Sequence, residues 1–504
     1  MIIAAFVLYL VMMLYIGFHY SRSKTSSSAE FYLGGRQLGP LVAAMSAEAS
    51  DMSSWLLMGI PGLAFITGLA SPLWTVLGLG IGTYVNWLVT TKRLRRYTIE
   101  LGAVTVPDFL SKRYHDRRNI LMAISAVVIL VFFVPYTAAG FKAVGVLLDS
   151  LFHIGYHPAM IVGAFVVIFY TIMGGFMAVS TTDLVQSIIM TLALIVIVCF
   201  ALHLAGGVDE IADNAKALPG YISAFTVHDN ATNTEQPYSF LSIISTMAWG
   251  LGYFGMPHIL LRFMAIRREE DIRLSRRIAT IWVFISMFVA IAIGIICYTV
   301  AQKGFLPAYS TTSEAESTLI DLSHLLATYG PLAALTAGVV LAGILASTMS
   351  TADSQLLTAA SAFSENLLRD VCKVKISEKA SIITARATII AVSVIAIFLA
   401  WNPDSSIFNI VSFAWAGFGA TFGPVMLASL FWKRTTLAGA ISGMAVGGIM
   451  IFVWKYAIAP LGSGWAIYEL LPAFICAGLA IILVSLCGKH PSADIVKEFE
   501  SIKQ

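Results

Sequence analysis

Long apolar runs alternate with short polar connections along almost the whole chain. A run of about 20 apolar residues is long enough for one helix to cross a bilayer. The pattern predicts an all-α polytopic membrane protein with 13 transmembrane helices. The helices are expected at residues 2–20, 41–68, 72–91, 119–147, 158–177, 184–205, 241–264, 278–300, 331–360, 382–401, 407–431, 438–456 and 468–487.

Two of these segments contain residues that interrupt a helix. In segment 41–68, Glu48 and Asp51 lie among four serines, although a charge at mid-membrane costs at least ~2.5 kcal/mol. Segment 241–264 contains three glycines and Pro257 within eight positions, which a regular helix interior does not favour. Both segments are predicted to be broken helices that line a polar site. The alternatives are a polar helix contact in the first segment and a close-packing glycine face in the second.

The spacing of the interruptions predicts the architecture. The broken segments open two blocks of five helices, and an odd number of helices inverts the second block relative to the first. We expect a single transmembrane domain over residues 1–504, with repeat one at 41–205 and repeat two at 241–431. Helix 1 and the last two helices, at 438–487, would be peripheral.

Composition and charge agree with a membrane protein and predict its orientation. Of 504 residues 58% are hydrophobic and 12% are charged, whereas about a quarter are charged in soluble proteins. All but four of the 31 lysines and arginines fall in alternate connections or in the C-terminal tail. By the positive-inside rule the N-terminus lies outside and the C-terminus is cytoplasmic. The segment Arg262–Arg277 is interpreted as a solvated inner loop.

Hydroxyl and aromatic side chains suggest an ion and a solute as ligands. Ser347, Ser350, Thr351 and Ser354 would form a stripe on one helix face and could supply the oxygen ligands that a hard cation prefers. Alternatively, each hydroxyl could bond the preceding turn of its own helix. Trp249 and Tyr253, four residues apart, would form an apolar wall with a polar tip against a small amphipathic solute.

The chain resembles the sodium/solute symporter family over nearly its whole length, and within it the bacterial proline transporters. The motifs that carry the resemblance are Phe31–Pro40, Ala49–Ser53, Trp55–Gly59, Gly174–Asp183, Trp249–Gly255, Pro257–Leu260, Met349–Thr351 and Ala414–Gly419. The family fold is the 13-helix, five-plus-five inverted repeat of leucine-transporter-like proteins. The resemblance implies sodium-coupled uptake of L-proline by alternating access across a bacterial cell membrane. It implies no enzyme activity, no nucleic acid and no obligate protein partner.

The resemblance also implies roles for particular residues. The sodium ligands would come from Ala49, Met52, Ser347, Ser350 and Thr351. Asp51 and Arg36 would couple the ion to the solute, although Arg36 could simply be a positive-inside arginine. The solute would contact Ser53, Ser54, Tyr136, Trp249, Tyr253 and Pro257.

Three acidic residues raise alternatives to simple sodium coupling. Glu48 stands where the proline transporters have glycine, so it could carry a proton, or it could be a protonated structural residue. Asp183, a further coupling candidate, could form a second cation site with Asp353, or it could be a helix N-cap in Ser180–Asp183. The alternative function is sodium- or proton-coupled symport of another small amino or organic acid, such as pantothenate.

Overall fold

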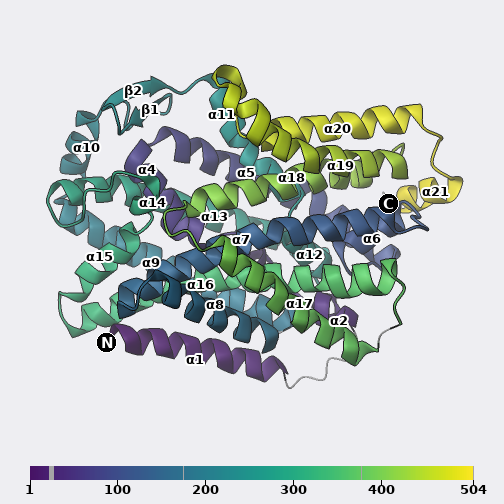
Figure 1. Ribbon diagram of the computed structural model, residues 1–504, viewed down its shortest axis with the longest axis horizontal. Helices are drawn as coiled ribbons and strands as arrows, with labels where there is room; N and C mark the ends of the chain where they lie inside the picture. Colours follow the sequence, from purple (N-terminus) through teal and green to yellow (C-terminus); the bar gives the residue numbers. More distant parts are fainter. Residues whose placement is uncertain (22–27, 174, 376, 503–504) are drawn as a thin grey trace.

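The computed structural model describes residues 1–21, 28–173, 175–375 and 377–502, so Gly174 of the quoted motif lies outside the described residues. Long helices run side by side along one direction (Figure 1). Within the described ranges, ten helices are long and apolar enough to cross a membrane, and the prediction of exactly 13 stays a prediction. The long helices are α1 (Ile2–Ser21), α5 (Ala70–Glu100), α7 (Ile120–Phe152), α9 (Phe176–Ala205), α13 (Asp271–Gln302), α16 (Pro331–Ser361), α17 (Glu378–Leu399), α18 (Ile407–Phe431), α19 (Leu437–Val453) and α20 (Leu470–Cys487). Large apolar side chains such as Leu8 and Phe165 are exposed by 70% and 66%, as expected of a surface that faces lipid.

Both predicted helix interruptions are present. In the first, α3 (Pro40–Ala49) ends before a short non-helical stretch, which the π-helix η2 (Trp55–Gly59) and then α4 (Ile60–Thr67) follow. In the second, α11 (Phe240–Met247) passes into the 3₁₀-helix η3 (Ala248–Phe254), and α12 (Pro257–Ala265) begins after an extended Met256. Proline at the first turn of α12 suits a helix start, because that position needs no N–H donor.

The glycines of the second interruption also pack closely against other helices. A Cβ atom on Gly250 would lie 2.2 Å from the carbonyl oxygen of Gly78 in α5. A Cβ atom on Gly252 would lie 1.9 Å from Nε1 of Trp415 in α18. The broken-helix interpretation and the close-packing alternative are therefore both correct for this segment.

Several helices are longer than predicted, and the added length of one of them changes the position of Asp183. The helix α9 begins at Phe176, so Asp183 lies two turns inside it. The N-cap alternative for Asp183 is therefore wrong, because apolar Phe176–Val179 extends the helix upstream of the hydroxyl-rich turn. The helix α7 extends to Phe152, and Lys142, which the predicted segment 119–147 already contained, is 2% exposed and lies 4.0 Å from a carboxylate oxygen of Glu316.

Short elements gather at the two ends of the helix bundle (Figure 1). One end, here called the hairpin end, contains the N-terminus and five short elements. They are α10 (Val208–Ala217), α14 (Thr312–Ala315), α15 (Thr318–Ala327) and the antiparallel strands β1 (Thr226–Asp229) and β2 (Thr234–Pro237). The other end, here called the basic end, contains the C-terminus, α2 (Ser28–Leu33), α6 (Val106–Arg113) and α21 (Ala493–Ser501). The remaining span-like helix, α8 (Tyr156–Met173), lies beside α7.

Candidate ion and solute site

The end of α3 places a free backbone carbonyl against α16. The N–H of Ser53 donates to the carbonyl oxygen of Asp51 at 2.9 Å, so it does not return to Ala49 as it would in a continuous helix. The Ala49 carbonyl instead accepts from the Ser350 hydroxyl at 2.8 Å and from the Thr351 hydroxyl at 3.4 Å. The same two hydroxyls also reach the carbonyl oxygen of Ser347, at 3.1 and 3.2 Å.

Four of the five predicted sodium ligands are therefore brought together, from two elements about 300 residues apart in the chain. Two carbonyls and two hydroxyls form an uncharged set of oxygen donors, which is the chemistry that a hard monovalent cation requires. Met52 is less clearly part of this group. Its sulfur accepts from the Ser286 hydroxyl of α13 at 3.7 Å, and within the described residues no hydrogen bond joins it to α16. The assignment of all five residues as sodium ligands stays a prediction.

Asp51 lies where three helical elements meet. One carboxylate oxygen, Oδ2, accepts a hydrogen bond of 2.7 Å from the Tyr253 hydroxyl of η3. The Asp51 carbonyl accepts from the Tyr136 hydroxyl of α7 at 3.0 Å and from Nε1 of Trp55 at 2.9 Å. All four side chains are buried, and the second carboxylate oxygen, Oδ1, has no partner among the described residues. The predicted coupling residue is thus bonded directly to two predicted solute residues.

Aromatic rings form a wall beside this junction. Trp249 packs against Trp55, Phe408 and Tyr468, with ring centroids 6.1, 5.2 and 5.3 Å away. Nε1 of Trp415 donates to the Trp249 carbonyl at 2.8 Å and so satisfies a backbone group at the broken helix. Of the residues in this wall, only Trp249 was predicted from the sequence as part of the solute site. Buried tryptophan usually needs a partner for its N–H, and that rule could have drawn attention to Trp55 and Trp415.

The other predicted solute residues provide polar groups near the interruptions. Ser53 and Ser54 are buried, and neither hydroxyl has a hydrogen-bond partner among the described residues. Pro257 forms the first turn of α12 and is fully inside the protein. Unsatisfied buried hydroxyls are uncommon in folded proteins and call for an explanation such as a missing ligand or water.

Glu48 faces a different helix from the sodium candidates. Its Oε1 atom accepts from the Thr83 hydroxyl and from Nε1 of Trp87, both at 2.9 Å and both in α5. The side chain is fully buried, and Oε2 has no partner among the described residues. Glu48 is therefore adjacent to Ala49 in sequence, yet its carboxyl group bonds α5 whereas the Ala49 carbonyl bonds α16.

A second group of buried polar side chains lies nearer the basic end. It includes Arg262, which was predicted to lie in a solvated loop. Arg262 is inside α12 and 1% exposed, so its interpretation as part of a solvated loop is wrong. It forms an ion pair of 3.2 Å with Asp183. The pairing across 79 residues compensates the burial of both charges, which charge counting along the chain cannot detect. Asp353 belongs to the same group through Ser354, and the second cation site of Asp183 and Asp353 stays a prediction.

Arg36 does more than contribute positive charge at the basic end. It lies in the 3₁₀-turn η1 (Gly34–Arg36), and its guanidinium donates to the carbonyls of Met264, Ala103 and Thr98 at 2.6, 2.7 and 3.1 Å. Partial burial and the neighbouring Arg95 lower the pKa of Arg36 to about 10, so it stays charged at neutral pH. The side chain joins the segment before α3 to the ends of α5 and α12.

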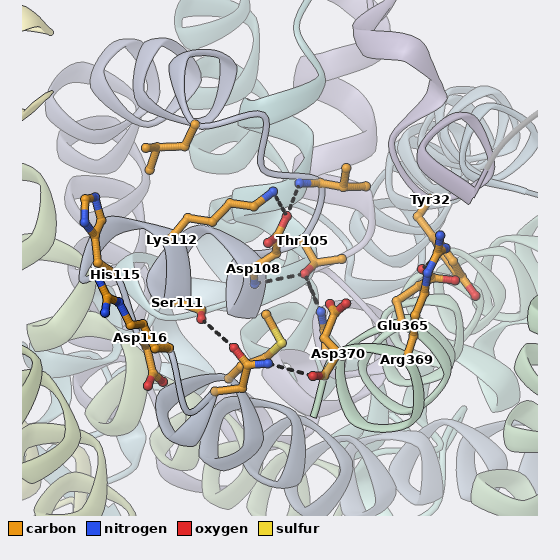
Figure 2. Close-up of a pocket in the computed structure, with 16 residues that line it drawn as sticks. Tyr32, Thr105, Asp108, Ser111, Lys112, His115, Asp116, Glu365, Arg369 and Asp370 are labelled. Atoms are coloured by element: carbon orange, nitrogen blue, oxygen red, sulfur yellow. Dashed lines mark hydrogen bonds and ion pairs between the residues drawn. The ribbon is translucent and has the colours of Figure 1, made fainter. Parts of the chain in front are cut away.

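A cavity of about 920 Å³ opens at the basic end (Figure 2). Its lining comes from α6, from the connections on either side of α6, and from the π-helix η4 (Ala362–Val371), which continues α16. Lys112 pairs with Asp108 at 2.9 Å in its wall, and Tyr32 lies at its margin, bonded to Ser364 at 2.8 Å. None of the predicted sodium or solute residues lines this cavity. The predicted site is thus buried in the middle of the bundle, apart from this opening.

Comparison with known proteins agrees with this geometry. The family model described as the sodium:solute symporter family matches residues 31–447. Sodium/proline symporters of Staphylococcus aureus strains USA300 and COL are 39% identical over 503 residues, covering 98% of this chain and 94% of each relative.

Two solved structures share the fold. A sodium-coupled sialic acid symporter in a substrate-bound outward-open state has a TM-score of 0.77 at 18% identity, covering 97% of this chain and 98% of that one. A nucleobase-cation-symport-1 family transporter has a TM-score of 0.57 at 12% identity, covering 95% and 99%. The motifs, the two interrupted helices and the family match together establish that this chain belongs to the sodium:solute symporter family.

Proposed function

We propose that this chain is a sodium-coupled symporter that carries L-proline into the cell. The observation that carries the proposal is the junction at the end of α3. There the free Ala49 carbonyl meets Ser350 and Thr351, and two residues later Asp51 meets Tyr253. Curated relatives at 39% identity that carry the name sodium/proline symporter support the choice of solute.

Sodium would bind the carbonyls of Ala49, Met52 and Ser347 and the hydroxyls of Ser350 and Thr351. The two hydroxyls now point at the Ala49 carbonyl, and on binding they would turn their lone pairs to the ion. Sodium would then connect the broken helix α3 to the continuous helix α16. The inward membrane potential contributes ~2.3 kcal/mol per charge for every 100 mV, which drives accumulation of the solute.

Proline would bind on the other side of Asp51. Its ring would lie against Trp249, Tyr253 and Tyr136, which supply buried aromatic surface. Its carboxylate would take hydrogen bonds from Ser53 and Ser54, whose hydroxyls are buried without partners in the described part of the chain. Pro257 would shape the far wall at the start of α12. Because Asp51 bonds both tyrosines, movement of α3 on ion binding would alter the solute site directly.

Alternating access would use the inverted repeats, with the basic end in the cytoplasm and the N-terminus outside. The N-terminus and the C-terminus lie at opposite ends of the bundle, which supports an odd number of spans (Figure 1), and the concentration of lysine and arginine in alternate connections supports the cytoplasmic placement of the basic end. The three shorter apolar helical stretches, Trp55–Thr67, Tyr156–Ile172 and Phe240–Phe254, would bring the number of spans to 13. Helix α1 and helices α19 and α20 would stay peripheral. In the inward-closed state, Arg36 would fasten the start of α3 to α5 and α12.

A second mechanism, proton-coupled symport, is favoured by one observation. Glu48 is a buried carboxyl group with an unpartnered oxygen, beside the junction. A buried carboxyl group without a cationic partner tends to hold a proton. Its anchoring on α5 favours a structural role over a coupling role.

Uptake of radiolabelled proline into proteoliposomes tests the proposal. An inward sodium gradient should drive uptake at constant pH, and an inward proton gradient without sodium should not. Unlabelled proline should compete, whereas pantothenate and glutamate should not. Uptake driven by protons alone would overturn sodium coupling. Sodium-driven uptake of pantothenate but not proline would keep the coupling ion and overturn the solute.

A further inference from the structure

Five buried side chains from four helices form one polar cluster on the basic-end side of the sodium candidates. We call it the guanidinium cluster, and it consists of Ser46, Asp183, Arg262, Asp353 and Ser354. Ser46 lies one turn before Ala49 on α3, and Ser354 lies one turn beyond Thr351 on α16. All five are at most 1% exposed. The cluster therefore lies next to the proposed sodium site along both helices that form that site.

The guanidinium of Arg262 occupies the centre of the cluster. Nε donates to the Ser46 hydroxyl at 3.0 Å, and Nη2 donates to the Ser354 hydroxyl at 2.5 Å and to Asp183 Oδ2 at 3.2 Å. Nη1 donates to the carbonyl of His258, one turn earlier in α12, at 2.9 Å. The Ser46 hydroxyl in turn donates to Asp183 Oδ2 at 2.6 Å. Every element of the cluster is thus bonded to this one arginine or to its partners.

The same oxygens would suit a metal cation if the arginine were absent. Two carboxylates and two hydroxyls, all buried, are the donors that a hard cation such as sodium prefers. With Arg262 in place, only two oxygens lack a partner among the described residues, Oδ1 of Asp183 and Oδ2 of Asp353. Two oxygens are far fewer than the roughly six that hard cations usually gather.

We propose that Arg262 is a resident cation that fills a second cation position and limits this symporter to one sodium ion per solute molecule. The inference deepens the proposed function and rests on sodium symport. Arg262 moves with α12, so its positive charge is not released with the solute. An ion in the same place would be carried across and would double the charge transported in each cycle.

The proposal predicts what happens when the charge is removed. Arg262→Gln keeps a polar side chain but frees the hydroxyls of Ser46 and Ser354 and leaves two buried carboxylates without a cation. Uncompensated buried charge is strongly unfavourable, so the two carboxylates should bind either protons or a second sodium ion, and at alkaline pH, where protons compete least, the variant should take up the sodium ion. Arg262→Lys keeps the charge and should bind one. The double variant Arg262→Gln/Asp183→Asn removes one carboxylate together with the cation and should return to one.

Equilibrium binding of radioactive sodium to the purified protein, measured at alkaline pH without any solute, gives the number of sodium sites per chain. The expected result is one site per chain in the wild type and in Arg262→Lys, two in Arg262→Gln, and one in the double variant. In proteoliposomes, the charge moved per proline should rise from one to two in Arg262→Gln.

Two sites in the wild type would overturn the inference, and so would a folded Arg262→Gln protein that binds one. If Arg262→Gln does not fold, the wild-type and Arg262→Lys counts still decide, because two sites in either contradict the proposal. No sodium binding by the wild type would instead overturn the proposed function, so the two failures are distinct.

Discussion

The hydroxyl of Tyr253 donates a 2.7 Å hydrogen bond to Asp51, and this contact joins the two interrupted helices of the protein. Asp51 follows the end of α3, whereas Tyr253 lies in the 3₁₀ segment between α11 and α12. The two predicted repeats therefore meet through one buried carboxylate, two residues from the carbonyl that α16 contacts. The Ala49 carbonyl proposed to bind sodium is therefore joined to Tyr253 of the proposed solute site by two residues of backbone and one hydrogen bond.

Removal of the Tyr253 hydroxyl should weaken solute binding. Tyr253→Phe leaves Oδ2 of Asp51 without its hydrogen-bond donor, at a cost of about 1–3 kcal/mol. Because about 1.4 kcal/mol corresponds to a tenfold change in affinity, the Kd for proline at saturating sodium should rise about fivefold or more. Tyr456→Phe, at a position 66% exposed, is the control and should leave the Kd unchanged. An unaltered Kd in Tyr253→Phe would show that the contact does not support the solute site.

Loss of the Thr351 hydroxyl should weaken sodium binding, whereas loss of the Thr358 hydroxyl on the same face of α16 should not. Thr351→Val removes a hydroxyl that reaches the Ala49 carbonyl, and the sodium concentration for half-maximal uptake should rise about tenfold, as expected for ~1.4 kcal/mol. Thr358→Val is the matched control two turns away, because the hydroxyl of Thr358 contacts only Ser354 of its own helix in the described structure. Equal shifts in the two variants would argue against a sodium site at Thr351.

Glu48 should matter for stability more than for coupling. Glu48→Gln keeps an oxygen that can accept from Trp87 and Thr83, so sodium-driven uptake should stay within about twofold of the wild type. Glu48→Ala leaves both buried donors unpaired and should lower the free energy of unfolding by about 1–3 kcal/mol. The measurements are uptake and the thermal unfolding midpoint in detergent. Loss of uptake in a stable Glu48→Gln protein would identify the carboxyl group as a proton carrier.

Close backbone contact between α5 and η3 should make Gly82 intolerant of substitution. A Cβ atom on Gly82 would lie 2.4 Å from the Cα atom of Gly250, and overpacking of this kind typically costs about 1–3 kcal/mol. Gly82→Ala should therefore lower the thermal unfolding midpoint. Gly478→Ala is the control, since no heavy atom lies within 4 Å of its Cβ position, and its midpoint should be unchanged or higher. Equal midpoints for the two variants would contradict the packing seen here.

The sequence was informative where local chemistry decides the structure. The serines beside Asp51 compete for helical hydrogen bonds, and the glycines before Pro257 disfavour a helix interior, so both breaks could be predicted from local chemistry. Arg262 was misplaced because its partner Asp183 is 79 residues away and only the folded bundle brings them together. The direction of Glu48 depends on how α3 is rotated against α5, which an apolar pattern on all sides of a helix does not define.

The members of the aromatic wall could likewise be predicted only in part from the sequence. Trp249 stood out because of its position in the interrupted segment. Phe408 and Tyr468 come from segments far along the chain, and their rings reach Trp249 only after α18 and α20 pack against η3. A residue's own neighbours in sequence carry no information about such contacts.

The most direct test of coupling is the Kd for proline, measured on the purified protein by equilibrium binding at a series of sodium concentrations. Coupling free energy is reciprocal, so sodium should tighten proline binding by the same factor by which proline tightens sodium binding. We expect that factor to be at least about fivefold, the lower end of typical couplings, and to require about tenfold more sodium in Thr351→Val, as expected for ~1.4 kcal/mol. A Kd for proline that is independent of sodium, with potassium replacing it at constant ionic strength, would contradict the account.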